Sequence, residues 1–295
     1  MITGFAIILD NKILYVSNEN KFPTFEIVLF VEKLINSINP KNLWRLTNIF
    51  FEGKKTKERM IIRHITTEQN QNIFYCITGD FLSNSREADK LLDEFYEKVS
   101  ANYETIEKIK EFYKRTEFKK VIKLITGYLW DKYYYPLEDE ELDYRCTPTE
   151  NKLIYCGLSS QGLPILSQLY DTSLLQSFHR EINHENIDLF TSNLSARLAT
   201  IAMNTQIRAK TNIKEIHFDD LQLQGCKKLI LYGIINGYSL DFIASGDFFK
   251  IKGIFEQLEQ KMFKEPILHQ EFSGELKPYR SLKSYLDEIA GQFDQ

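Results

Sequence analysis

His179 and His184, in the stretch HREINHE, come nearest to the spacing of a metal site. Zinc-binding H-E-x-x-H motifs work because two histidines four residues apart share one face of a helix. Five residues apart, the two histidines of this chain point about 140° away from each other at 3.6 residues per turn. Glu185 and Asp188 lie near His184 and offer carboxylate ligands. The spacing nevertheless favours ordinary surface positions, and we expect no metal.

Sequence motifs for other kinds of catalysis do not occur. The chain has no G-x-x-x-x-G-K-[ST] phosphate loop, no G-x-G-x-x-G fingerprint and no G-x-S-x-G serine elbow. Its cysteines, Cys76, Cys146, Cys156 and Cys226, are scattered without a C-x-x-C pair, which predicts free thiols. Cys76 and Cys226 are expected to be small core residues rather than nucleophiles. We therefore expect a protein that is not an enzyme and carries no cofactor.

A tetrapeptide occurs twice, as TGDF at 78–81 and as SGDF at 245–248, each time between an apolar run and a helical pattern. Glycine lets the chain leave a strand at an angle that other residues avoid. Asp80 and Asp247 can each accept a hydrogen bond from a free backbone N–H near the next helix. Capping explains these carboxylates better than catalysis does, since no partner residue lies nearby in the sequence.

The stretch from 104 to 150 is rich in charge. Its first part is helical and basic, with an apolar side predicted from Val121, Ile122 and Leu124, and an acidic run at 138–143 follows. A solvated connecting helix and a charged loop explain this pattern. The sharper hypothesis is a surface that contacts anionic lipid or an acidic partner. The residues that this hypothesis selects are Lys114, Arg115, Lys119 and Lys120.

Apolar spacing predicts the elements that hold these positions. In the first half we expect strands at 5–9, 13–17, 43–51, 58–67 and 72–78, and helices at 22–40 and 85–99. Thr24 is expected to cap the first helix. In the second half we expect strands at 152–158, 163–169, 213–218, 228–235 and 238–244, and helices at 186–203 and 246–263. Both halves therefore read ββαβββα.

Composition limits the class of protein. An apolar fraction of 43% and a charged fraction of 26% are typical of a globular protein in water. A formal net charge of −4 argues against a dedicated nucleic-acid binder. No apolar run approaches the roughly 18 residues of a membrane span. The start, MITGFAIILDNK, lacks the basic region of a signal peptide, so we expect a cytoplasmic protein.

The repeated order, together with GLPILSQLYD and IKEIHFDD in the second copy, resembles the longin and roadblock superfamily. The resemblance implies an α+β fold of two longin-like (profilin-like) domains, each a five-stranded antiparallel sheet flanked by helices. The family places its second strand at a sheet edge, which suits Pro164 because proline cannot donate to a ladder. The predicted parts are domain 1 at 1–103, a helical and charged linker at 104–150, domain 2 at 151–265 and a C-terminal helical tail at 266–295. A capping box at Ser173 and Gln176 predicts one extra short helix.

The family serves as a platform for small GTPases and for the assembly of trafficking complexes. Its tandem members resemble exchange-factor subunits that act on Rab-type GTPases. The resemblance therefore implies a non-enzymatic interaction module, an exchange factor or a scaffold, that binds a small GTPase or another longin/roadblock protein. Peripheral membrane contact fits the same job. The alternatives are a PAS- or GAF-like small-molecule sensor, which also uses a five-stranded antiparallel sheet, and an unrecognised hydrolase.

Overall fold

The computed structural model describes residues 1–38, 43–67, 71–82, 85–134, 151–176, 184–221 and 227–293. They form two compact units. The first unit takes the described parts of 1–29, 46–145 and 208–211, and the second takes those of 30–45, 146–207 and 212–295. The acidic run 138–143, Cys146, His179 and Cys226 lie outside the described residues.

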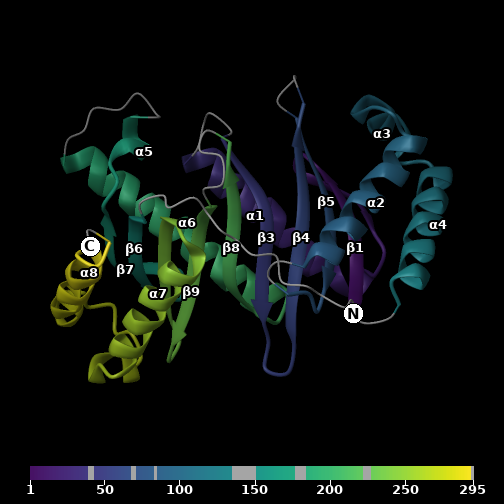
Figure 1. The fold of residues 1–295 in the computed structure, drawn as a ribbon. Coiled ribbons are helices and arrows are strands. Elements are labelled where there is room, and N and C mark those ends of the chain that lie inside the picture. The colour runs from purple at the N-terminus through teal and green to yellow at the C-terminus, as the bar shows by residue number, and fades with distance from the viewer. Residues whose placement is uncertain are drawn as a thin grey trace. The chain divides into compact units, whose positions relative to one another are not determined.

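The first five strands form antiparallel pairs in the order β2-β1-β5-β4-β3 (Figure 1). Their bounds are β1 Ile2–Leu9, β2 Lys12–Val16, β3 Trp44–Glu52, β4 Lys57–Thr66 and β5 Asn72–Gly79. Asp10, with a positive φ of 49°, opens the tight turn that joins β1 to its antiparallel neighbour β2.

The other five strands form antiparallel pairs in the order β8-β9-β10-β6-β7. Their bounds are β6 Lys152–Ser160, β7 Leu163–Leu169, β8 Asn212–Asp220, β9 Lys227–Ile235 and β10 Tyr238–Gly246. Counted from the first strand of each set, the two sets share one order. Pro164 lies on the outermost strand β7, as predicted. Asn236 and Gly237 both have positive φ, as a two-residue hairpin turn between β9 and β10 requires.

Eight α-helices accompany the strands in the described residues. They are α1 Phe22–Ile38, α2 Arg86–Asn102, α3 Ile106–Phe112, α4 Thr116–Lys132, α5 Ser173–Gln176, α6 His184–Arg208, α7 Phe248–Phe263 and α8 Lys283–Ala290. Short 3₁₀ turns are η1 Glu19–Lys21, η2 Pro266–His269 and η3 Lys277–Leu282. The fold is thus a mixture of helices and antiparallel strands. Its division into two longin-like domains, with the predicted boundaries, stays a prediction.

Helix starts follow the predictions in part. Asp247 caps α7, since its carboxylate accepts from the backbone N–H of Lys250 at 2.8 Å. The same prediction for Asp80 is wrong, because α2 begins six residues later and is capped by Ser85, which accepts from Ala88 at 2.9 Å. Thr24 is not a cap either, because α1 already begins at Phe22. The repeated tetrapeptide therefore marks a strand end in both copies but a helix start in only one.

One core cluster joins α2, α3 and α4 to a single face of strands β1, β2, β4 and β5. α2 packs on β4 and β5, whereas α4 reaches β1 through Trp130, whose ring centroid lies 5.8 Å from that of Phe5. The hydroxyls of Tyr15 on β2 and Thr126 on α4 lie 3.0 Å apart. Residues 106–132, expected in a linker, therefore supply buried side chains to this core: Ile109, Phe118, Ile122, Ile125 and Leu129.

A second core cluster lies between β6, β9, β10 and the helices α7 and α8. The helix predicted at 246–263 is confirmed as α7, and its apolar spacing buries five side chains on one side: Ile251, Ile254, Phe255, Leu258 and Met262. Residues 266–289 contribute as many: Leu268, Tyr279, Leu282, Leu286 and Ile289. The hydroxyl of Tyr238 on β10 donates to the carbonyl of Gln270 at 2.6 Å and lies 2.8 Å from that of Tyr279. The C-terminal segment is therefore a structural part of the second unit.

Asp241 is fully buried on the opposite face of the same strands. It stands on β10 between Gly157 of β6 and Tyr232 of β9 in register. Its neighbours along β10 face α7, so the alternation of a strand turns Asp241 the other way. The Tyr155 hydroxyl fills the space above Gly157, because a Cβ there would lie 2.0 Å from it. The carboxyl thus sits among aromatic rings.

Ser239 donates a hydrogen bond of 2.8 Å to Oδ1 of Asp241. Within the described residues, Oδ2 of Asp241 and the hydroxyl of Tyr232 have no hydrogen-bond partner. Desolvation raises the pKa of Asp241 to about 7, and the bond from Ser239 offsets only part of that shift. The buried carboxyl is therefore neutral in mildly acidic solution.

This buried carboxyl predicts a pH-dependent stability. Above pH ~4 the unfolded chain releases the Asp241 proton, whereas the folded protein keeps it up to about pH 7. The free energy of unfolding should therefore fall by about 2 to 3 kcal/mol between pH 5 and pH 8. Asp241→Asn should remove this part of the fall, as measured by urea unfolding of both proteins at both pH values. An equal fall in the variant would contradict the assignment.

Candidate functional site

An open hollow of about 720 Å³ lies in the first unit, at the turn between β3 and β4. The turn itself supplies most of its wall, and the start of β1, the end of β5 and the short turn η1 supply the rest. The residues around it are Met1, Thr3, Lys21, Glu52, Gly53, Lys54, Lys55, Thr56, Lys57, Glu58, Gly79 and Asp80. It joins four lysines to three carboxylates, so it is a polar, mixed-charge surface.

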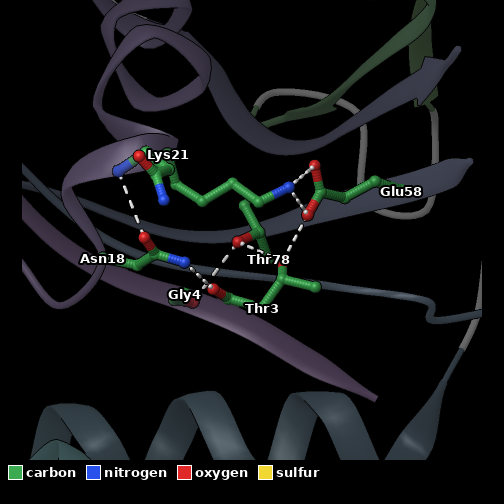
Figure 2. Close-up of polar contacts among 7 residues, drawn as sticks. Thr3, Gly4, Asn18, Lys21, Glu58 and Thr78 are labelled. Atoms are coloured by element: carbon green, nitrogen blue, oxygen red, sulfur yellow. Dashed lines mark hydrogen bonds and ion pairs between the residues drawn. The ribbon is translucent and has the colours of Figure 1, made fainter.

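Figure 2 shows the polar network at its base. The ammonium of Lys21 donates to both carboxylate oxygens of Glu58, at 2.6 and 2.8 Å. The hydroxyl of Thr3 donates to the same carboxylate and lies 2.9 Å from the hydroxyl of Thr78. Strands β1, β4 and β5 and the turn η1 thus converge on one carboxylate, and each fixes the others.

Local sequence explains this convergence. Asn18 caps η1 by accepting from the N–H of Asn20 at 3.1 Å, and its amide donates to the carbonyl of Thr3 at 3.3 Å. The cap therefore holds Lys21 above the start of β1. At the hairpin, the N–H of Gly53 donates to the carbonyl of Thr56 at 2.7 Å, which closes the turn.

Some charged side chains of the hollow are paired with each other, and others are not. Lys21 and Glu58 are half-buried and neutralise each other, and Lys57 pairs with Glu52 at 3.3 Å. Lys54 and Lys55 are exposed and make no ion pair within the described residues. The arrangement can therefore hold an anionic group at the hairpin tip, against a base whose charges are already balanced.

The predicted contact residues lie elsewhere, at the junction of α3 and α4, and all four are exposed. Arg115 is engaged, because its guanidinium pairs with Glu111 at 3.0 Å and lies 4.2 Å from the ring centroid of Phe112. Lys114 lies 5.7 Å from the ring of Tyr113. Lys119 and Lys120 have no ion-pair partner in the described part of the chain. The structure thus separates the four by how strongly they are held.

Sequence reasoning missed two residues on this helix. Leu124 is 75% exposed and Tyr128 49% exposed, although Leu124 was expected on the apolar side with Ile122. Residues two apart on a helix point about 160° away from each other, so Ile122 and Leu124 cannot share a face. Placing each residue at 100° intervals around the helix axis predicts the exposure of Leu124 from the sequence alone.

The other chemically capable residues have structural roles. Glu215 on β8 is buried between His217, at 3.0 Å, and Lys252 of α7, at 2.9 Å, so it ties the helix to the strand. The ring of His64 stacks 4.3 Å from that of Phe74. Cys76 and Cys156 are free and fully buried, and desolvation raises the pKa of both thiols, which disfavours the nucleophilic thiolate.

His184, Glu185 and Asp188 are exposed at the start of α6. Across the described ranges, no three His, Cys, Asp or Glu side chains gather closely enough to hold a metal ion. A search of the helices in the same ranges finds none that is both long and apolar enough to cross a bilayer. No protein-family model matches the chain, and no curated protein matches it.

The network at the base of the hollow predicts a difference between two lysines. Lys21→Met should lower the free energy of unfolding by about 1–2 kcal/mol, because it leaves the shielded carboxylate of Glu58 without its cation. Lys57→Met is the matched control, since its pair with Glu52 is far more exposed, and should cost less than about 0.5 kcal/mol. Urea unfolding at pH 7 measures both. Equal effects would show that the network does not stabilise the unit.

Proposed function

We propose that the chain is a non-catalytic, cytoplasmic interaction module that binds a small GTPase or another trafficking protein. The observation that carries the proposal is the open hollow at the β3–β4 hairpin, with two uncommitted lysines at its tip. A partner that offers carboxylates to Lys54 and Lys55 and a cation to Asp80 would complement its charges. Mixed charges of this kind select a partner and its orientation more than they raise affinity.

The strand arrangement supports the same proposal. Two five-strand sets share one order, and each has its second strand outermost, as the longin resemblance implies. Pro164 on β7 removes one donor from an outer strand, which discourages unspecific pairing with other chains. In a tandem longin protein, the natural activity is to act as exchange factor or scaffold for a GTPase. The proposal assigns no catalytic residue to this chain.

The sensor alternative requires a ligand-sized space between a sheet and its helices. In the second unit, the space between the strands and the helices is filled by buried side chains. They come from β6, β9, β10, α7 and α8 and pack against one another. The hollow that we describe is instead open and lies at a hairpin. We therefore retain the interaction module as the one proposed function.

Binding to a panel of purified small GTPases, each nucleotide-free and loaded with GDP or GTP, tests the proposal. The wild-type chain should bind at least one of them, and Lys54→Glu with Lys55→Glu should weaken that binding by at least about tenfold, because two attractive charge pairs become repulsive. Lys277→Glu with Lys283→Glu, two exposed positions in the second unit, is the matched control and should bind as wild type.

Two outcomes would contradict the proposal. The first is that no GTPase binds in any nucleotide state. The second is that the hairpin variant and the control bind equally well, which would move the contact away from the hollow. A preference for the nucleotide-free form would identify exchange activity, whereas a preference for the GTP form would identify an effector.

A further inference from the structure

Three lysines of α4 form an exposed basic row. The inward side of α4 is fixed by Phe118, Ile122, Ile125 and Leu129, which are buried in the core of the first unit. Lys119, Lys120 and Lys123 therefore point outward, and none of them has an ion-pair partner among the described residues. Figure 1 shows α4 as the outer helix beside α2 and α3. All three lysines are exposed in the described part of the chain.

An apolar pair borders this row. Leu124 and Tyr128 are one turn apart on the exposed side, and Gly127 between them leaves open space where another residue would place a side chain. The ammonium of Lys98 lies 4.4 Å from the ring centroid of Tyr128. Lys98 is itself paired with Glu94 at 3.6 Å, so the ammonium groups without an ion pair beside Leu124 and Tyr128 are those of the basic row. A single exposed leucine is ordinary, but a leucine and a tyrosine beside such a row are a distinct surface.

The segment that contains α4 carries a net positive charge. Residues 106–132 hold eight lysines and arginines against four acids, although the whole chain carries −4. Two of the acids, Glu117 and Asp131, are on α4, and Glu111 is engaged by Arg115. Four of the eight bases are paired: Lys108 with Glu104, Lys110 with Asp10, Arg115 with Glu111 and Lys132 with Glu94. The positive charge that no ion pair balances within the described residues therefore lies at Lys114, Lys119, Lys120 and Lys123.

We propose that α4 lies on an anionic membrane surface, with Lys119, Lys120 and Lys123 at the level of the lipid phosphates and Leu124 and Tyr128 entering the interface. The surface is one convex helix side, which fits a broad lipid plane better than a peptide that needs a groove. Lysines act as point charges, which suits a diffuse anionic surface, whereas paired recognition of a carboxylate favours arginine. Tyrosine and leucine are typical of the membrane-facing side of interfacial helices.

This inference does not depend on the proposed protein partner. The membrane surface is on α4, whereas the proposed partner site is at the β3–β4 hairpin. The same chain can therefore bind a membrane and a protein at the same time. Membrane binding and protein binding are tested separately, and the failure of one does not contradict the other.

Flotation of the full chain with vesicles tests the inference. Vesicles of phosphatidylcholine alone are compared with vesicles that contain phosphatidylserine, at low and physiological salt. The wild type should bind the anionic vesicles only, and binding should weaken as salt rises. Replacement of Lys119, Lys120 and Lys123 by Glu should lower the affinity by at least about 100-fold, since each lysine contributes roughly fivefold.

Matched variants separate this effect from general charge. Lys264→Glu, Lys277→Glu and Lys283→Glu together make the same change in net charge at exposed positions of the second unit, and should bind within about threefold of wild type. Leu124→Ser with Tyr128→Ser should lower affinity by about tenfold or more while keeping the salt dependence. The hairpin variant Lys54→Glu with Lys55→Glu should bind vesicles, so that loss of a GTPase partner and loss of membrane contact are read separately.

The inference is overturned if the wild type ignores anionic vesicles at low salt. It is also overturned if the two triple variants lose affinity equally, or if the Leu124 and Tyr128 variant binds as well as wild type. Thermal unfolding of each variant establishes that the fold is intact. A lysine variant that unfolds is replaced by Lys→Gln at the same positions, for which the same order of affinities is expected.

Discussion

Burial of both faces of the central strands is the constraint on which the rest of the structure depends. Every residue of β5 is buried, and so are all but one of β6. A strand covered on both sides reads as a continuous apolar run rather than an alternating one. Such a strand leaves no room for chemistry at its middle, so polar function is displaced to turns, strand ends and the outer sides of helices.

The two surfaces that we describe follow from this constraint. The hollow with Lys54 and Lys55 lies at a hairpin, where β3 and β4 have left the covered part of the sheet. The lysine row of α4 lies on the side of a helix whose other side completes a core. Asp241 is the exception, because it places a carboxyl in the middle of a covered strand, and its raised pKa of about 7 records the cost of that position.

The sequence predicts these features to different depths. The helices α2 and α7 were predicted close to their observed bounds, at 85–99 and 246–263, because apolar spacing along one helix is local information. The caps were predicted less well, since Asp80 and Asp247 share a tetrapeptide but only Asp247 is followed at once by a helix. Where the chain bends after a strand depends on packing that four residues do not encode.

The hollow was not predicted, because its parts are far apart in the sequence. Thr3, Lys21, Glu58 and Thr78 meet only once β1, β4 and β5 have paired, and hairpin lysines have no periodic signal. The basic stretch of α4 was found from composition. Its four selected residues are not equivalent, however, since Arg115 is paired with Glu111 whereas Lys119 and Lys120 have no ion pair within the described residues. Lys123, which was not selected, completes the exposed row.

The packing of residues 266–289 has a consequence for the order in which the chain can fold. These residues complete the layer that covers β6, β9 and β10, together with α7. Until a ribosome has made the polypeptide through Ile289, that side of the strands has only part of its apolar lid. The second unit can therefore close only after this segment has been made, and a nascent chain halted before Pro266 would present a partly uncovered hydrophobic surface to chaperones.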